Sequence, residues 1–220
     1  MHMQIEEQLL EACRHLAGQQ FLNTPEDSCS MRVPGCAEMI FATGLHDWHQ
    51  VRNSDLHRLP LSVAAGSAAL HATVYGQRDD VGAVVISSPR WARLLRDRVA
   101  VLPPLFDEQV RHIGKAACWP GGMDGLLPAA IKNALRSGAN AALIGERLMC
   151  LGTTRDRAVF NTELFEKCAQ AFVLAQTTGK RISLIPVWVR FIANRRLLKD
   201  ERRAAESYRA GRIPEGMNAY

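Results

Sequence analysis

The stretch that decides the fold runs from residue 65 to residue 89 and reads AGSAALHATVYGQRDDVGAVVISSP. Its first half, Ala65 to Gln77, is predicted to form a helix. Its second half contains Val81 to Ile86, a continuous apolar run short enough for a strand that is buried on both faces. Pro89 has no backbone N–H to donate and therefore ends that strand. A helix followed closely by a buried strand is typical of a layered α/β domain.

The rest of the chain alternates in the same way between helical and extended patterns. Helices are expected over residues 4–18, 91–98, 127–137 and 155–178, and again in the tail around residues 188–198. Strands are expected over residues 28–33, 38–42, 141–144 and 148–151, and the segment 43–60 reads as polar and irregular. Because some of these strands are joined by tight turns, the sheet cannot be purely parallel.

Length and composition favour one globular domain over the whole chain, 1–220. The 220 residues are 47% hydrophobic and 22% charged, which is ordinary for a soluble protein. No apolar run approaches the roughly 18 residues that a membrane helix needs. The first ten residues carry Glu6 and Glu7 and lack the basic start and apolar core of a secretory signal. We therefore expect a cytoplasmic protein without membrane contact.

The positive charge is concentrated in the tail. The formal net charge is +5, and residues 181–220 contain nine Lys and Arg against four Asp and Glu. Such a surplus can attract nucleic acid or an anionic substrate. A solvated or intersubunit helix face is the preferred interpretation, and we do not expect a nucleic-acid partner.

Six cysteines occur without a Cys-x-x-Cys pair. Cys13, Cys150 and Cys168 have apolar neighbours and are expected to be reduced core residues. A metal site is conceivable where Cys29 and Cys36 precede a pair of histidines, His46 and His49. That spacing differs from common zinc fingers, so it gives little support to such a site.

Several motifs, taken in order, resemble one known family. They are Leu9–Leu16, Ser28–Gly35, Ile40–Gly44, Ser54–Leu56, Leu70–Tyr75, Asp80–Val85 and Glu163–Ala169. The closest match is Leu-His-Ala-Thr-Val-Tyr at residues 70–75 followed by Asp-Val-Gly-Ala-Val-Val at residues 80–85. Over residues 5–180 the chain is similar to the class II aldolase/adducin family, and residues 181–220 form a basic helical tail beyond that likeness.

The resemblance implies a three-layer α/β/α sandwich around a mixed, largely antiparallel sheet. It also implies a homotetramer with sites at subunit interfaces. Family enzymes are zinc lyases for small hydroxy-carbonyl or phosphorylated sugar substrates, in which three histidines hold the ion and a nearby glutamate moves protons.

This sequence departs from the family at each of those positions. The family's His-Thr-His-Pro is replaced by Ile86-Ser87-Ser88-Pro89. The third histidine falls in the turn Gly145-Glu146-Arg147, where Glu146 is placed at the ligand position and a shift by one residue stays open. The catalytic glutamate corresponds to Ser67. Neither the Ile86 side chain nor the Ser88 hydroxyl can replace an imidazole, so we expect no metal and no cofactor.

The remaining pocket is expected to bind a small polar or acidic metabolite. Its expected ligand-binding residues are Ser28, Ser30, Thr43, Gly44, Ser67, Ser87 and Ser88. The expected acid–base groups are His71 and Glu146, for a metal-independent proton transfer of lyase or isomerase type. Both have alternative interpretations, because His71 can be a structural helix histidine and Glu146 an exposed turn residue.

Other interpretations stay open. Asp107, Glu108 and His112 could supply a substitute acid–base group, although a solvated helix surface is the preferred interpretation. A loop around Trp48 could face a substrate or simply be anchored by its aromatic ring. The whole chain could be a non-catalytic, adducin-like interaction protein. Least favoured is an intact metal enzyme that uses His71 and Glu146.

Overall fold

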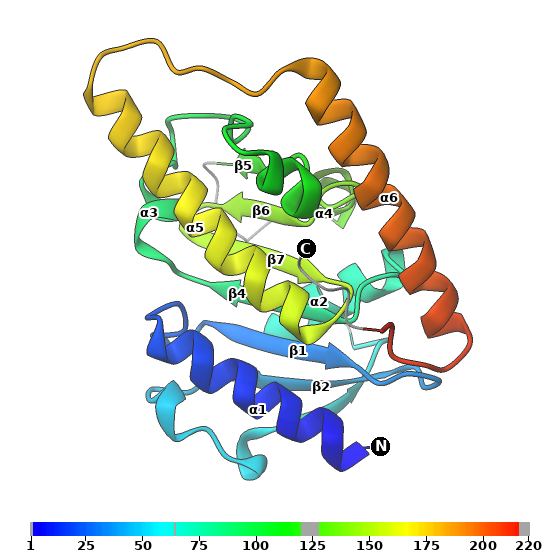
Figure 1. The fold of residues 1–220 in the computed structure, drawn as a ribbon. Coiled ribbons are helices and arrows are strands. Elements are labelled where there is room, and N and C mark those ends of the chain that lie inside the picture. Colours follow the sequence, from blue (N-terminus) through cyan, green and yellow to red (C-terminus); the bar gives the residue numbers. More distant parts are fainter. Residues whose placement is uncertain (1, 64, 120–127, 216–220) are drawn as a thin grey trace.

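Within the described residues, seven strands form one sheet in the order β3-β2-β1-β4-β7-β6-β5 (Figure 1). The computed structural model describes residues 2–63, 65–119 and 128–215. The strands are β1 (Ser28–Arg32), β2 (Glu38–Thr43), β3 (His57–Pro60), β4 (Ala83–Ser87), β5 (Ala117–Trp119), β6 (Ala141–Ile144) and β7 (Arg147–Gly152). Neighbouring strands are antiparallel except β5 and β6, which are parallel. The expected mixed, largely antiparallel sheet is confirmed.

Helices cover both faces of this sheet. The helices are α1 (His2–Gly18), α2 (Gly66–Gln77), α3 (Arg90–Arg93), α4 (Pro128–Ala134), α5 (Arg155–Thr177) and α6 (Val187–Arg209), with short helical turns at Trp48–Gln50, Asn53–Asp55 and Gln109–Ile113. Figure 1 shows α1 and α5 in front of the sheet and α2 behind it, on the opposite face. This is the expected α/β/α sandwich.

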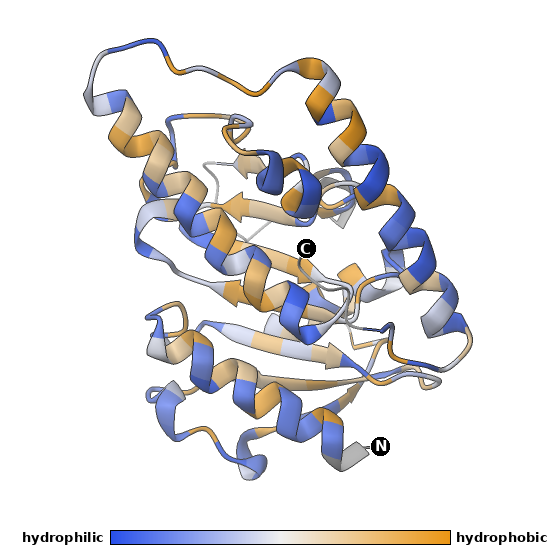
Figure 2. Cartoon of the chain, in the orientation of Figure 1, coloured by the Kyte–Doolittle hydropathy of each residue, from blue (hydrophilic) through white to orange (hydrophobic). Residues whose placement is uncertain are grey.

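The period of two along each strand divides the core between the layers. On β4, Val85 packs with α1, whereas Val84 and Ile86 pack with α2. Figure 2 shows the strands as largely hydrophobic and the outer faces of α1 and α5 as mostly hydrophilic. Whether a strand residue is at an odd or an even position therefore determines to which face of the sheet its side chain points.

Two elements differ from the sequence prediction. The helix expected over residues 91–98 stops at Arg93. Asp97 has a φ of 62°, in the left-handed region, which is incompatible with a right-handed α-helix. Residues 57–60, expected to be irregular, form the edge strand β3, which pairs with β2. Three of its four residues are exposed, so it lacks the apolar alternation by which a strand is recognised.

The tail helix α6 lies across the end of the sheet and is tied down by buried charges. Glu201 contacts the guanidinium of Arg78 at 3.1 Å, and Asp200 forms an ion pair with Arg111. Arg78 also pairs with Asp80 at 2.7 Å. Two of the tail's acids thus point inward, which leaves the outer side of α6 basic.

Candidate functional site

His71, the first candidate acid–base group, lies in the core between α2 and β1. Its Nε2 is 2.9 Å from the Ser28 hydroxyl and its Nδ1 is 2.7 Å from the Ser30 hydroxyl. Ser30 continues the chain of hydrogen bonds to the Tyr75 hydroxyl at 2.7 Å. The ring of Phe41 closes one side of the imidazole. The structure therefore brings the predicted residues Ser28, Ser30 and His71 together.

The imidazole of His71 is fully buried. Burial disfavours its charged form and lowers its pKa from the ordinary value of 6.5 to about 3. The ring is therefore neutral at pH 7, with one nitrogen donating and the other accepting a serine hydrogen bond. This position is that of a satisfied core histidine.

A second cluster is centred on the buried carboxylate of Asp27, immediately before β1. Its Oδ1 accepts hydrogen bonds from the Ser88 hydroxyl at 2.9 Å and from Arg147 Nη1 at 3.1 Å. Its Oδ2 accepts the backbone N–H groups of Asn23 and Thr24, each at 2.8 Å. The Arg147 guanidinium is also 3.3 Å from the Thr24 hydroxyl. Predicted residue Ser88 thus belongs to an ionic cluster that the sequence did not reveal.

Arg147, and not Glu146, turns toward this cluster. In the β4–β7 pairing, Ile86 lies opposite Met149 and Ser87 opposite Leu148, which puts Arg147 beside Ser88. Glu146 belongs to the preceding turn, has a side chain that is 59% exposed, and pairs with Arg96 at 3.1 Å. The structure does not bring Glu146 to His71.

Two further predicted pocket residues lie elsewhere. Ser87 has the strand position of Val85, so its side chain points to the opposite face from Ile86. Its hydroxyl is buried and has no hydrogen-bond partner among the described residues. Ser67 is exposed at the start of α2. The structure therefore does not bring Ser87 together with Ser28, Ser30 and His71, because successive strand residues face opposite ways.

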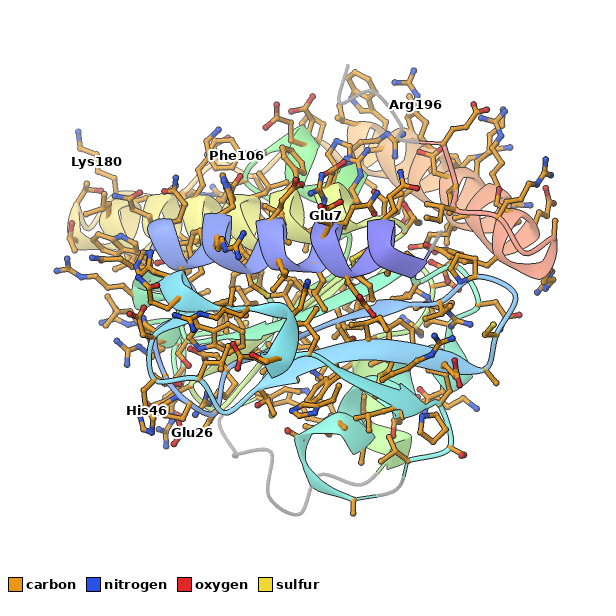
Figure 3. The ribbon with its side chains drawn as sticks, turned by 90° about the horizontal axis from the view of Figure 1, so that it is seen from below. Glu7, Glu26, His46, Phe106, Lys180 and Arg196 are labelled. Atoms are coloured by element: carbon orange, nitrogen blue, oxygen red, sulfur yellow. The ribbon has the colours of Figure 1, made fainter. Side chains whose placement is uncertain are left out.

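The end of β2 completes the neighbourhood of Asp27. The Thr43 hydroxyl donates to the Asp27 carbonyl at 3.1 Å, and the Gly44 amide donates to the Pro25 carbonyl at 2.9 Å. Trp48 is buried, and its indole donates to the Thr24 carbonyl at 3.0 Å. Figure 3 shows the nearby Glu26 at the same corner of the molecule as His46. Trp48 therefore anchors this loop, as the simpler of its two interpretations proposed.

The alternative acid–base group around His112 is not assembled. His112 is buried against Phe160, and its Nδ1 is 2.7 Å from Arg157 Nη1. Burial, followed by the charges of Arg157 and Arg111, lowers its pKa to about 3. Asp107 and Glu108 are exposed. The charges of Arg157 and Arg111 thus outweigh that of Asp107 at His112.

The residues that sequence reasoning missed are Asp27 and Arg147. Asp27 directly precedes the first expected strand, and Arg147 follows Glu146 in the 145–147 turn, and neither belongs to a recognisable motif. The alternation of β7 was the available signal, because it places residue 147 on the face of Met149. In the part of the chain that the structure describes, no three His, Cys, Asp or Glu side chains are grouped as a metal site requires.

Sequence comparison points to the same family as the motifs. The profile of the Class II Aldolase and Adducin N-terminal domain matches residues 7–173, which is well over half of the chain. No curated protein is similar enough in sequence to count as a match.

Solved structures share the fold at low sequence identity. L-fuculose 1-phosphate aldolase from Glaciozyma antarctica superimposes with a TM-score of 0.74 at 18% identity, over 94% of this chain and 88% of that protein. The aldolase of the same name from Thermus thermophilus gives 0.69 at 18% identity, over 81% and 98%. An aldolase II superfamily protein from Pseudomonas syringae gives 0.71 at 17% identity, over 88% and 84%. The chain therefore belongs to the class II aldolase and adducin family.

Proposed function

We propose that this chain is a class II aldolase-like protein that has exchanged its metal site for a fixed arginine and binds a small acidic metabolite there. The observation that carries the proposal is the position of Arg147. Its guanidinium lies beside Ser88, at strand positions where the resemblance puts metal ligands, and a quarter of its side chain remains exposed. A planar guanidinium can bind a carboxylate with two parallel hydrogen bonds.

The donors at the family's ligand positions do not fit a zinc ion. Ile86 has no donor atom, and the Ser88 hydroxyl already donates to Asp27. Glu146 points into solvent, toward Arg96. The nearby carboxylates of Asp27 and Glu26 are paired with Arg147, at 3.1 Å and 3.3 Å, and are not free to bind a metal ion. We therefore propose that ordinary zinc-dependent aldol cleavage is absent.

Ligand binding is better supported than proton transfer. The proposed acid–base groups, His71 and Glu146, do not share a cavity in the chain, because one is enclosed by serines and the other is exposed. A metal-independent lyase or isomerase would need a residue outside these two to move the proton. Of the predicted ligand-binding residues, Ser88 bonds the Asp27 carboxylate directly and Thr43 bonds the Asp27 backbone.

Calorimetric titration with malate and glycolate tests the binding proposal. Both molecules combine a carboxylate with a hydroxyl group and have no apolar body. We expect one molecule of at least one of them to bind per chain and Arg147→Gln to abolish that binding. Arg96→Gln is the matched control, because it removes an exposed guanidinium that pairs with Glu146 on the outside. Equal losses in the two variants, or no binding by the parent, would refute the proposal.

A non-catalytic interaction protein is the second candidate, and the surface of α6 favours it. Val187, Trp188 and Phe191 are 70%, 67% and 63% exposed, which is unusual for large apolar side chains on one helix. We propose a homotetramer that covers part of this surface.

All six cysteines are free thiols, which supports our proposal of a cytoplasmic location. No helix among the described residues is long and apolar enough to cross a membrane.

A further inference from the structure

We propose that the groove between α6 and the β5 edge of the sheet binds a small amphipathic anion, with a carboxylate head and an apolar body. The groove has a volume of about 730 Å³, within the range of small-molecule sites. It shares no residue with the His71 or Asp27 clusters. The inference is therefore independent of the proposed function.

The floor and walls of the groove are mostly apolar. Val101, Leu102 and Val110 line it from the segment around the β5 edge, and Trp119 lines it from β5 itself. Phe191 closes it from α6. Figure 2 shows the first turns of α6 as largely hydrophobic and the later turns as mostly hydrophilic. An aliphatic chain or an aromatic ring would bury apolar surface here on binding.

The charged side chains that the structure describes in the groove are all basic. Lys115, Arg136 and Arg190 line it, and none of its lining residues within the described part of the chain is an Asp or Glu. Arg190 is half-buried, and its Nε atom is buried without a hydrogen-bond partner among the described residues. A buried donor on a charged group that lacks an acceptor is costly, and such atoms in native structures are satisfied by a partner.

A ligand carboxylate would supply the missing acceptor. It would place a negative charge among three cations, and its oxygens would match the planar guanidinium of Arg190. The apolar walls favour a ligand that also carries an apolar chain or ring, which acetate and glycolate lack. Trp188 and Ile192, which are exposed on α6, do not line the groove, so a second copy could pack against them without filling it.

Titration with decanoate at concentrations far below its micellar range tests the inference. Calorimetry is expected to show one decanoate per chain, with acetate and decanol each binding at least about tenfold more weakly. Arg190→Gln should weaken decanoate binding by about tenfold or more, the effect of losing one charge-assisted hydrogen bond. Arg196→Gln is the matched control, because Arg196 is an exposed arginine of the same helix that does not line the groove (Figure 3). Its affinity for decanoate should match that of the parent.

Several outcomes would overturn the inference. Equal weakening by both substitutions would mean a diffuse electrostatic attraction, and unchanged binding by Arg190→Gln would mean an unspecific apolar surface. Failure of decanoate to bind, together with dissociation of an oligomer by Val101→Asp, would mean that a second copy fills the groove. Binding to vesicles of anionic phospholipid in place of free decanoate would mean a membrane surface. Retained melting temperatures show that the variants are folded.

Discussion

The burial of His71 makes the stability of the whole fold depend on pH. Its folded pKa of about 3 lies below the ordinary 6.5, so the unfolded chain takes up the proton first. The stability that this adds is fully present above pH 6.5 and is lost as the pH falls toward 3, by about 1.4 kcal/mol per pH unit. Between pH 7 and pH 5 we expect a loss of about 2 kcal/mol from His71, measurable by urea denaturation at both pH values.

The variant His71→Gln measures the contribution of His71 to the pH dependence of stability. It should be less stable than the parent at pH 7, because it breaks the hydrogen bonds to Ser28 and Ser30. Between pH 7 and pH 5, the free energy of unfolding of this variant should fall by about 2 kcal/mol less than that of the parent. The loss of stability due to His112, whose pKa is also lowered, should remain in the variant. An identical loss in parent and variant would show that His71 is not buried neutral.

Residue 147, and not residue 146, is predicted to occupy the third ligand slot of the family. The triple variant Ile86→His, Ser88→His and Arg147→His should bind about one zinc per chain, because alternate strand residues and their neighbour on β7 face the same side. The matched variant with Glu146→His in place of Arg147→His should bind far less. Elemental analysis after dialysis measures both. Equal zinc contents would contradict the assignment of the slot to residue 147.

At the scale of elements, α6 is held to the sandwich by one buried ionic network. Glu201 contacts Arg78 and accepts the Gly138 backbone N–H at 3.0 Å. Removing one partner of a buried pair leaves the other charge uncompensated, so Glu201→Ala should lower the free energy of unfolding by about 3 kcal/mol or more. Glu206→Ala, at an exposed position of the same helix, should change it by less than about 0.5 kcal/mol. Urea denaturation distinguishes the two, and equal effects would show that the network does not hold α6.

The elements that the sequence predicts well are those whose pattern is set by burial on one or both faces. β4 appears at Ala83–Ser87 and α5 at Arg155–Thr177, close to the expected 81–86 and 155–178. β3 and β5 escaped prediction because both lie toward the edges of the sheet, where few side chains are buried and a strand can be as short as three residues. Their pairing partners, distant in the sequence, determine that they are strands.

The candidate site was predictable only in part, for a different reason. Motif spacing identified Ser28, Ser30, His71 and Ser88, and the structure brings the first three together and joins Ser88 to Asp27. It could not determine which residue of the 145–147 turn points inward, because a shift of one residue exchanges the two faces of a strand. Nor could it show that the enclosing serines leave His71 no opening to a cleft.

At the scale of the whole molecule, the charge of the tail and its apolar surface belong to different parts of α6. Asp200 and Glu201 turn toward the body, so the outward residues of the later turns are mainly basic. The early turns instead expose Trp188 and Ile192 beside the groove. The basic part is suited to solvent, and the apolar part is the surface for which we expect a partner copy.

Light scattering with size-exclusion chromatography tests the proposed tetramer. We expect a mass of four times the 24.4 kDa chain at micromolar concentration. The double variant Trp188→Ser and Ile192→Ser should shift the mass to that of one or two chains, because buried aromatic and aliphatic residues supply much of the free energy of association. Leu174→Ser is the matched control, since Leu174 is a similarly exposed apolar residue on α5, and it should leave the mass unchanged. A monomeric parent would contradict both the proposed interface on α6 and the expectation that the site at Arg147 is shared between subunits.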